Sequence, residues 1–90
     1  MYIFKLFRIE EWLQFKALGK TDGAPIDVMD GFIHFSKANQ VKETAAKHFK
    51  ADKDLILLSC NAENLKPDLK WEISRGGELF PHLYRKLLLK

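Results

Sequence analysis

The sequence predicts a small α+β domain with two helices and about five or six short strands. Short runs rich in branched and aromatic side chains predict the strands, and two longer segments with apolar residues at helical spacing predict the helices. Clusters of glycine, proline, asparagine and aspartate separate these runs. The 90 residues suffice for one hydrophobic core but not for two, so we expect a single domain over residues 1–90.

The composition favours a cytoplasmic globular protein. The lone Cys60 cannot form an internal disulfide, which suits a reducing compartment. No apolar run approaches the roughly 18 residues that a membrane-spanning helix needs. Strand-like alternation begins at residue 2, so we expect no signal peptide and no membrane partner.

The basic charge says little about partners. The net charge is +3, and the lysines are scattered over positions that we expect to be exposed. A nucleic-acid surface more often clusters its cations and interleaves arginines or aromatic residues. Nucleic acid is therefore not the partner that the composition favours, and the sequence carries no signal for an oligomeric state.

The first half of the chain predicts two strands and a helix. Residues 2–8 alternate in polarity and are rich in aromatic and branched side chains, as strands are. Residues 10–18 predict a helix, with acidic residues in the first turn and a glycine just past its end. Residues 20–25 predict a loop, and residues 32–35 a short strand that follows an aspartate–glycine turn signal.

The second half predicts the other helix and the strongest strand. Ser36 can cap a helix over residues 37–49, whose apolar side chains fall on one face. Residues 54–60 are so apolar that we expect a central strand covered on both faces. The remaining elements are a polar turn at 50–53, a turn region at 61–68, a strand at 69–73, a glycine-containing loop at 74–78 and a strand at 83–89.

Polar side chains capable of chemistry interrupt the predicted strands in two blocks, residues 30–36 and 71–84. Burying such groups without partners costs about 1–3 kcal/mol each, so we expect them to meet in a site. In the first block, His34 and Ser36 are two residues apart on a strand and face the same way. His34 could equally be a hydrogen-bonded structural histidine, and Ser36 a helix cap.

The second block begins with a glutamate and an arginine. Glu72 is either an ordinary surface carboxylate, an acceptor for a ribose hydroxyl, or a partner that holds Arg75. The guanidinium of Arg75 matches phosphate or carboxylate oxygens, and the glycines Gly76 and Gly77 let backbone amides approach a ligand. By themselves the two glycines are also typical of an ordinary hairpin loop.

The second block ends with a histidine and a tyrosine. If the chain stays extended, His82 and Tyr84 lie on one face, where they could bind a nucleotide or form a stacked structural pair. The three histidines, His34, His48 and His82, lack the spacing of zinc motifs, so we expect no metal. The serines lack a nucleophile-elbow sequence, which leaves a serine hydrolase unsupported.

The two blocks together resemble a known family. The resemblance rests on Asp30-Gly31-Phe32-Ile33-His34-Phe35-Ser36, on Trp71-Glu72 with Ser74-Arg75-Gly76-Gly77, on Phe80-Pro81-His82-Leu83-Tyr84, and on Pro25-Ile26-Asp27 with matching residues between 40 and 49. Over nearly the whole chain these look like the bacterial and plant family catalogued as domain of unknown function 952. Arg85 and Lys86 stand where its members usually have glycine and proline.

The resemblance implies an ADP-ribosyltransferase-like fold, with two short, roughly orthogonal β-sheets and two helices around a cleft. The tRNA 2′-phosphotransferases have a similar fold, and the active enzymes hold NAD in this cleft. On this resemblance we expect the catalytic residues to be His34, Glu72 and His82, and the ligand-binding residues to be Ser36, Arg75, Gly76, Gly77 and Tyr84.

The expected ligand is a small anion or a nucleotide such as NAD or ADP-ribose. NAD would be a substrate, with no cofactor bound tightly, and tRNA stays open as a partner because of the likeness to the phosphotransferases. Two alternatives to a transferase remain. One is a non-catalytic module that binds a nucleotide or small anion, and the other is an interaction domain whose polar cluster is a structural network.

Overall fold

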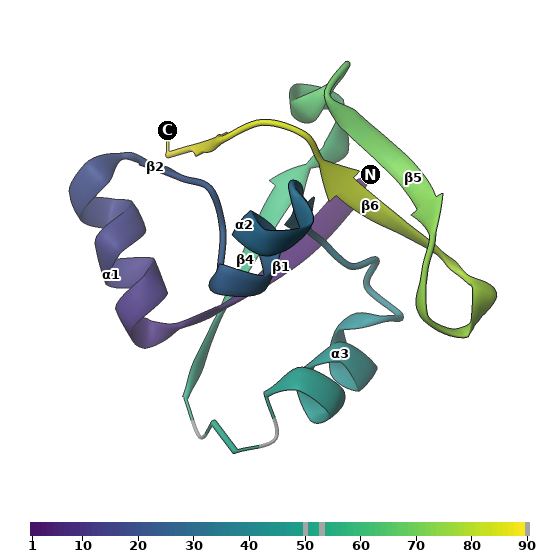
Figure 1. Cartoon of the computed structure of the whole chain (residues 1–90), viewed down its shortest axis with the longest axis horizontal. Helices are drawn as coiled ribbons and strands as arrows, with labels where there is room; N and C mark the ends of the chain where they lie inside the picture. Colours follow the sequence, from purple (N-terminus) through teal and green to yellow (C-terminus); the bar gives the residue numbers. More distant parts are fainter. Residues whose placement is uncertain (50, 53, 90) are drawn as a thin grey trace.

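The longest sheet pairs two strands from opposite halves of the chain. In the computed structural model, which describes residues 1–49, 51–52 and 54–89, β1 (Tyr2–Arg8) and β4 (Leu55–Asn61) run antiparallel over seven residue pairs (Figure 1). The strand β1 alternates as predicted, so that Ile3, Lys5 and Phe7 point inward. A lysine therefore lies on the buried face of this strand.

A second sheet carries most of the polar blocks. Its antiparallel strands are β3 (Ile33–His34), β6 (Leu79–Leu83) and β5 (Leu69–Ile73), in that order. An isolated bridge links it to the first sheet, because Phe4 and Ser36 exchange two backbone hydrogen bonds of 2.8 Å. A short pair, β2 (Lys20–Thr21) and β7 (Leu87–Leu88), completes the strands of the described residues.

Within the described residues three α-helices connect the strands, where the sequence predicted two. They are α1 (Ile9–Leu18), α2 (Pro25–Asp30) and α3 (Val41–His48), and the short 3₁₀ turns η1 (Ala62–Leu65) and η2 (Arg75–Gly77) flank β5. The unexpected helix is α2, which has proline in its first turn and ends at Gly31. The aspartate–glycine pair therefore ends a helix, and the predicted turn at Gly31 and short strand after it are both present, with the strand reduced to Ile33–His34.

Three further predictions need correction. The helix predicted from residue 37 begins at Val41, so Ser36 is not its cap, because a turn over residues 38–40 precedes it. In the described chain β4 pairs only with β1, and Leu57 is 54% exposed, so this strand is neither central nor covered on both faces. The strand predicted at 83–89 is divided between β6 and β7. Of the turn predicted at 50–53, residues 50 and 53 lie outside the described residues.

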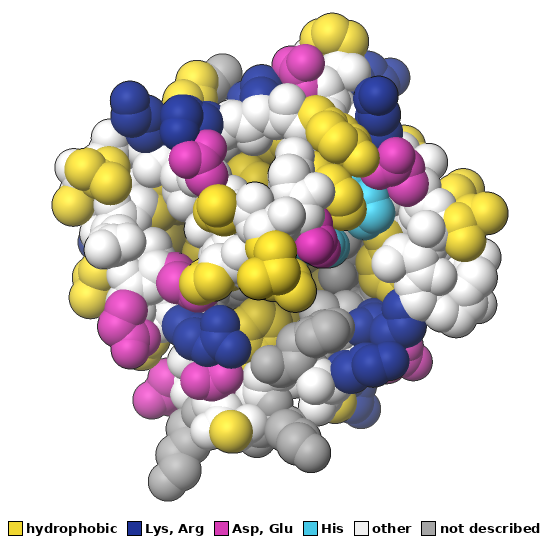
Figure 2. All heavy atoms as spheres, in the orientation of Figure 1, with side chains coloured by type: hydrophobic (Ala, Val, Ile, Leu, Met, Phe, Trp, Pro, Cys, Tyr) yellow, Lys and Arg dark blue, Asp and Glu magenta, His cyan; other side chains and the backbone are white. Residues whose placement is uncertain are grey.

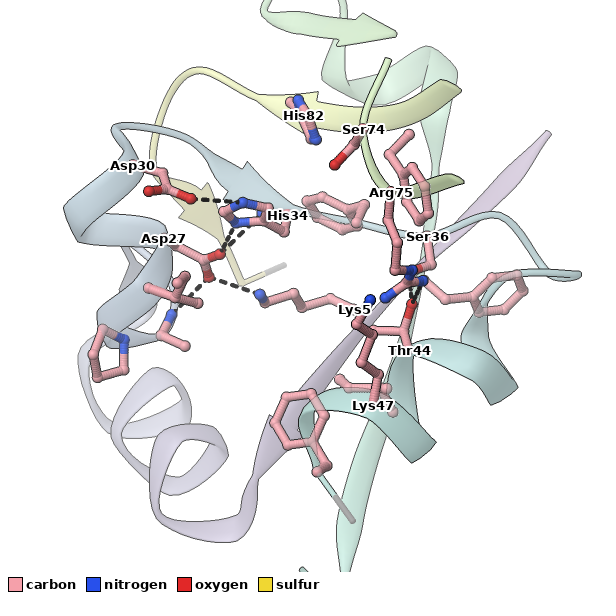
Figure 3. Close-up of a pocket in the computed structure, with 18 of the residues that line it drawn as sticks. Lys5, Asp27, Asp30, His34, Ser36, Thr44, Lys47, Ser74, Arg75 and His82 are labelled. Atoms are coloured by element: carbon pink, nitrogen blue, oxygen red, sulfur yellow. Dashed lines mark hydrogen bonds and ion pairs between the residues drawn. The ribbon is translucent and has the colours of Figure 1, made fainter. Parts of the chain in front are cut away.

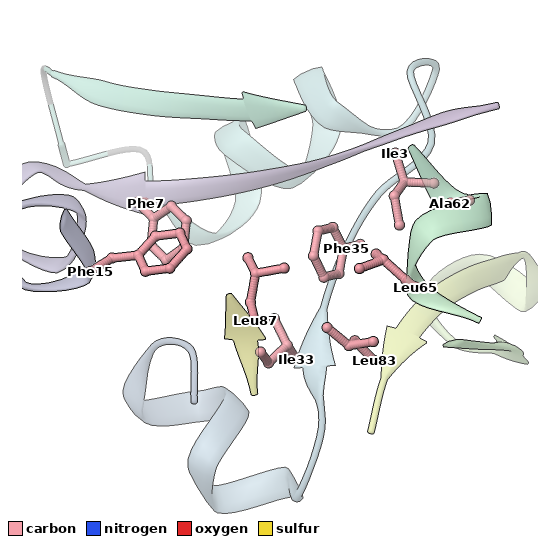
Figure 4. Packing of buried hydrophobic residues seen from close by; sticks show 9 residues of the cluster. All are labelled: Ile3, Phe7, Phe15, Ile33, Phe35, Ala62, Leu65, Leu83 and Leu87. Atoms are coloured by element: carbon pink, nitrogen blue, oxygen red, sulfur yellow. The ribbon is translucent and has the colours of Figure 1, made fainter. Parts of the chain in front are cut away.

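The hydrophobic core joins the first sheet to the second (Figure 4). Its buried members come from β1, α1, β3 and the residue after it, η1, β6 and β7: Ile3, Phe7, Phe15, Ile33, Phe35, Ala62, Leu65, Leu83 and Leu87. Burial of such side chains contributes about 1.5–3 kcal/mol each. The core thereby fixes β1, β3 and β6 relative to one another, and these strands carry Lys5, His34 and His82. Among the described helices, none is both long and apolar enough to cross a membrane.

Candidate functional site

A cleft of about 740 Å³ opens between β1, α2, α3 and the η2 turn. This volume lies within the range that small-molecule sites usually have. The charged side chains on its wall are Lys5, Arg8, Asp27, Asp30, Lys47 and Arg75. Histidine side chains are visible from outside, next to acidic groups, on the face that Figure 2 shows. The cleft is thus open to solvent and carries more cations than anions.

Asp27 on α2 is the most heavily bonded side chain of the cleft (Figure 3). It is 1% exposed, and its Oδ2 accepts hydrogen bonds of 2.7 Å from Lys5 Nζ and from the backbone N–H of Ala24. Its Oδ1 lies 2.5 Å from His34 Nδ1 and accepts from the His34 backbone N–H at 3.1 Å. Burial raises the pKa of Asp27, but the hydrogen bonds from His34 and the charge of Lys5 outweigh it and hold the pKa below its usual range.

His34 lies between two carboxylates of the same helix. Its Nδ1 faces Asp27, and its Nε2 lies 3.1 Å from Asp30 Oδ2. The side chain is one-third exposed, at 33%, so the ring forms part of the cleft wall while both nitrogens have acidic neighbours. This arrangement fixes the orientation of the imidazole.

His82 is held from behind by a carboxylate of the neighbouring strand. Its Nδ1 lies 2.8 Å from Glu72 Oε1, and the hydroxyl of Tyr84 donates to the same oxygen at 2.7 Å. The hydrogen bonds from Tyr84 and then from His82 lower the pKa of Glu72. The hydrogen bond to Glu72 raises the pKa of Tyr84. These three residues form one hydrogen-bonded chain from the cleft wall to the surface.

The two histidines of the cleft are direct neighbours across β3 and β6. His34 and His82 are register partners, and their ring centroids are 5.4 Å apart. Phe32 stacks on His82 with centroids 4.1 Å apart and also contacts the Tyr84 ring. His82 is 4% exposed, so this aromatic group fixes one imidazole while the other is more open to solvent.

Arg75 occupies the opposite side of the cleft (Figure 3). Its Nη2 donates to Thr44 Oγ1 at 2.8 Å, and that hydroxyl lies 3.3 Å from Ser36 Oγ. The guanidinium carbon lies 5.1 Å from the centroid of the Phe80 ring. The Nε of Arg75 is 3.2 Å from Glu43 Oε1, yet it is not aligned for a hydrogen bond, and no described residue accepts one from it.

Four of the predicted site residues line the cleft: His34, Ser36, Arg75 and His82. Glu72 lies behind His82 and Tyr84 lies beyond it, so neither reaches the cleft wall as the structure describes it. Gly76 and Gly77 follow Arg75 in the η2 turn, and among the described wall residues neither is present. The catalytic and binding roles of all eight residues stay predictions.

No site role was predicted from the sequence for three residues that organise the site, Lys5, Asp27 and Thr44. For Lys5 a signal was present, since a lysine stands at an inward position of an alternating strand. Asp27 belongs to the Pro25-Ile26-Asp27 segment of the family resemblance, but no role was predicted for it because α2 was not recognised. Thr44 lies among the residues between 40 and 49 that match the family, and no role was predicted for it either. In the described part of the chain, no three histidine, cysteine or acidic side chains are grouped so that they could hold a metal ion.

Comparison with known proteins identifies relatives of the whole chain. The family model described as "Protein of unknown function (DUF952)" matches residues 6–90. The crystal structure of CC0527 from Caulobacter crescentus is 51% identical, with a TM-score of 0.94, over 98% of this chain and 77% of that chain. The solution structure of CC0527 is 51% identical, with a TM-score of 0.85, over 98% and 76% of the two chains.

The chain is also similar to the crystal structure of a double mutant of CC0527 from Caulobacter crescentus. The two are 50% identical, with a TM-score of 0.93, over 98% of this chain and 77% of that chain. None of the curated proteins matches the chain. Since the family model spans residues 6–90 and the blocks around His34 and His82 lie within it, the chain belongs to the DUF952 family.

Proposed function

We propose that the cleft binds a phosphorylated nucleotide of the NAD or ADP-ribose type. The observation that carries the proposal is the convergence of His34, Arg75 and His82 on one open cleft of about 740 Å³. An arginine is the side chain best suited to phosphate oxygens, and imidazoles and hydroxyls suit a ribose. A self-contained structural network would not need a solvent-filled space of this size between its members.

The polar and apolar parts of the wall suggest how such a ligand lies. His34 is assigned to the ribose, and Arg75 with the neighbouring Ser36 hydroxyl to a phosphate group. Phe49 and Phe80 also line the cleft and add apolar surface against which a base can pack. In this proposal Lys47 adds a further positive charge at the mouth.

The nature of the wall favours phosphate chemistry over glutamate-dependent chemistry. Glu72, the predicted catalytic glutamate, is occupied by His82 and Tyr84 behind the cleft. Histidines and an arginine face the ligand space instead, as transfer of a 2′-phosphate would require. We therefore propose a 2′-phosphotransferase-like activity on an ADP-ribosyltransferase-like fold, in which the 2′-phosphoryl group of a phosphorylated nucleotide passes to NAD as the acceptor and Glu72 acts through His82.

A binding module without catalysis is the second candidate. Its support is the position of His34, whose Nδ1 is hydrogen-bonded to Asp27 and whose Nε2 has Asp30 Oδ2 only 3.1 Å away before any ligand arrives. A ring held in this way positions a ligand readily, whereas proton transfer to that ligand requires Asp30 to move. The two candidates share the ligand and differ only in whether it is consumed.

The test is an NMR titration of the protein with NAD, ADP-ribose and a 2′-phosphorylated nucleotide. We expect shifts around β3, η2 and β6, and weaker binding in the variants His34→Ala and Arg75→Gln. The second variant is needed because His34 bonds to the buried Asp27, so its removal can unfold the chain. Arg85→Gln is the matched control, since Arg85 pairs with Asp68 and lies off the cleft wall as described.

The outcomes separate the candidates. If millimolar nucleotide shifts no resonance near these elements, the nucleotide proposal fails. If a nucleotide binds and is never consumed, the binding module is correct. If the 2′-phosphate is transferred, the enzymatic candidate is correct.

A further inference from the structure

We propose that Arg75, Thr44 and Ser36 form an oxyanion subsite specific for a phosphate group, and that the Glu43 carboxylate occupies it in the ligand-free protein. The binding of phosphate would then displace Glu43. This inference rests on the proposed function, because it assigns the phosphate of the nucleotide to one corner of the cleft. It goes further in that it names an internal competitor for the ligand.

The first argument is the unused hydrogen-bonding capacity of Arg75. A guanidinium carries five N–H donors in a fixed plane. Among the described residues, one hydrogen bond from this group is present, from Nη2 to Thr44. The side chain is only 18% exposed, and its Nε is buried without an aligned acceptor. Buried donors of a charged group that lack acceptors are costly, so a tetrahedral oxyanion at this position would remove a penalty.

The other two arginines differ from Arg75 in this respect. Arg85 donates to the backbone oxygens of Lys86 and Asn64 and pairs with Asp68. Arg8 pairs with two carboxylates, its side chain is 40% exposed, and it lies against the Phe49 ring. Arg75 thus combines burial with free donors.

The second argument is the weakness of the present counter-ion. The Glu43 side chain is 74% exposed, and its oxygen lies 3.2 Å from Arg75 Nε without hydrogen-bond alignment. Exposed ion pairs contribute only about 0–1 kcal/mol, because water competes for both charges. A phosphate can therefore displace this carboxylate while Thr44 and the Phe80 ring keep the guanidinium in place.

The third argument is the set of groups around the guanidinium. Ser36 is 7% exposed, and its hydroxyl lies 3.3 Å from that of Thr44, so two hydroxyls lie beside one arginine. Figure 3 shows Ser36, Thr44 and Arg75 meeting at one side of the cleft, with Lys47 on the same side. Lys47 follows Thr44 by three positions on α3 and therefore lies near it on the helix surface. A dianion at this corner would meet two positive charges.

The test is a titration with inorganic phosphate, followed through the Arg75 Nε–Hε resonance. With three arginines in the chain, the variant Arg75→Lys assigns this signal by its loss. We expect phosphate to shift the signal. We expect Glu43→Gln to tighten phosphate binding about two- to fivefold, the change that the loss of one exposed competing ion pair produces. Arg75→Lys keeps the positive charge but loses the planar guanidinium with its parallel N–H donors, so we expect phosphate to bind about tenfold more weakly.

Glu63→Gln is the matched control. Glu63 is similarly exposed and pairs with Lys66 at 3.1 Å, and its substitution changes the net charge by the same amount as Glu43→Gln. If Glu43→Gln and Glu63→Gln change phosphate affinity equally, the displacement of Glu43 is overturned. If a nucleotide binds the wild type but phosphate leaves the Arg75 signal unmoved, the subsite is wrong and the nucleotide proposal stands. If phosphate binds as expected and no nucleotide does, the nucleotide proposal fails and the subsite stands.

Discussion

The ammonium group of Lys5 and the carboxylate of Asp27 form an ion pair of 2.7 Å at the floor of the cleft. Their side chains are 6% and 0% exposed, so both charges are out of water. The pair links β1 to α2, and Asp27 extends the link to β3 through His34. The orientation of His34 therefore depends on a contact between residues 22 positions apart.

We expect Asp27→Asn to destabilise the protein by about 3–5 kcal/mol, because the substitution leaves the Lys5 charge buried without a counter-ion. The free energy of unfolding in urea measures the loss. Asp22→Asn is the control, since Asp22 also pairs with a lysine at 2.7 Å but with side chains 58% and 51% exposed. That variant should lose at most about 1 kcal/mol. Equal losses in the two variants would show that burial of the Lys5–Asp27 pair has no special importance.

The lowered pKa of the Asp27 carboxylate predicts how the stability of the protein depends on pH. Burial raises the Asp27 pKa, but the hydrogen bonds from His34 and the Lys5 charge bring it below the ordinary value of 3.8. Since the pKa is lower in the folded than in the unfolded state, the stabilisation is complete above the unfolded-state pKa. It disappears as the pH falls through the folded-state pKa.

The urea midpoint of the wild type should therefore fall more steeply than that of Asp27→Asn as the pH is lowered through the ordinary aspartate pKa of 3.8 and below it. Glu72, whose pKa is also lowered, is present in both proteins, so the difference between the two curves isolates Asp27. Parallel curves would refute the assignment.

The hydrogen bond from Tyr84 to Glu72 predicts a change in tyrosine titration. This bond raises the pKa of Tyr84 above the ordinary value of 10.0. We expect Glu72→Gln to bring the Tyr84 pKa back toward that value, because the amide is uncharged and a weaker acceptor. The Tyr2→Phe background leaves Tyr84 as the one tyrosine of the chain, so its ultraviolet absorbance follows the titration directly. An unchanged Tyr84 pKa in Glu72→Gln would count against the bond.

Gly23 predicts a steric test of the Asp27 site. A Cβ added at Gly23 would clash with the side chain of Asp27, and the residue has φ +96°. We expect Gly23→Ala to cost more than about 2 kcal/mol, since it combines backbone strain with a clash against a buried carboxylate. Gly19→Ala is the control, because Gly19 has φ +74° and no atom within 4 Å of an added Cβ. Gly19→Ala should lower the free energy of unfolding only by the backbone strain of a non-glycine residue at positive φ, about 1–2 kcal/mol. The free energies of unfolding of both variants are measured in urea.

The elements with strong local patterns were predictable from the sequence. The alternation of residues 2–8 and the capping residues around α1 depend on neighbours in the chain, and both elements are present. The helix α2 was missed because six residues show too little periodicity to be distinguished from a loop. The apolar character of β4 predicted a central strand, but β1 is its one partner among the described strands.

The candidate site, like the fold, could be predicted only in part from the sequence. His34, Ser36, Arg75 and His82 were predicted as a cluster because their residue types are unusual for strands, and all four line one cleft. Glu72 shares their block in the sequence, yet the side of β5 on which it lies directs it to His82 and Tyr84. Successive side chains of a strand point to opposite faces of the sheet, so a shift of one residue would turn Glu72 to the other face. In a strand as short as β5 the sequence pattern does not determine which face a given residue occupies.

The sequence by itself determined the α+β class, the family and the polar side chains that gather at the cleft, because these depend on residue type and local spacing. Only the tertiary structure decided that Asp27 binds Lys5 and His34, that Glu72 lies behind His82, and that Arg75 meets Thr44 and Glu43. The physical reason is that each contact joins residues from different elements. Their distance depends on how the shared core packs β1, α2, α3 and β6 together, and no local pattern carries that information.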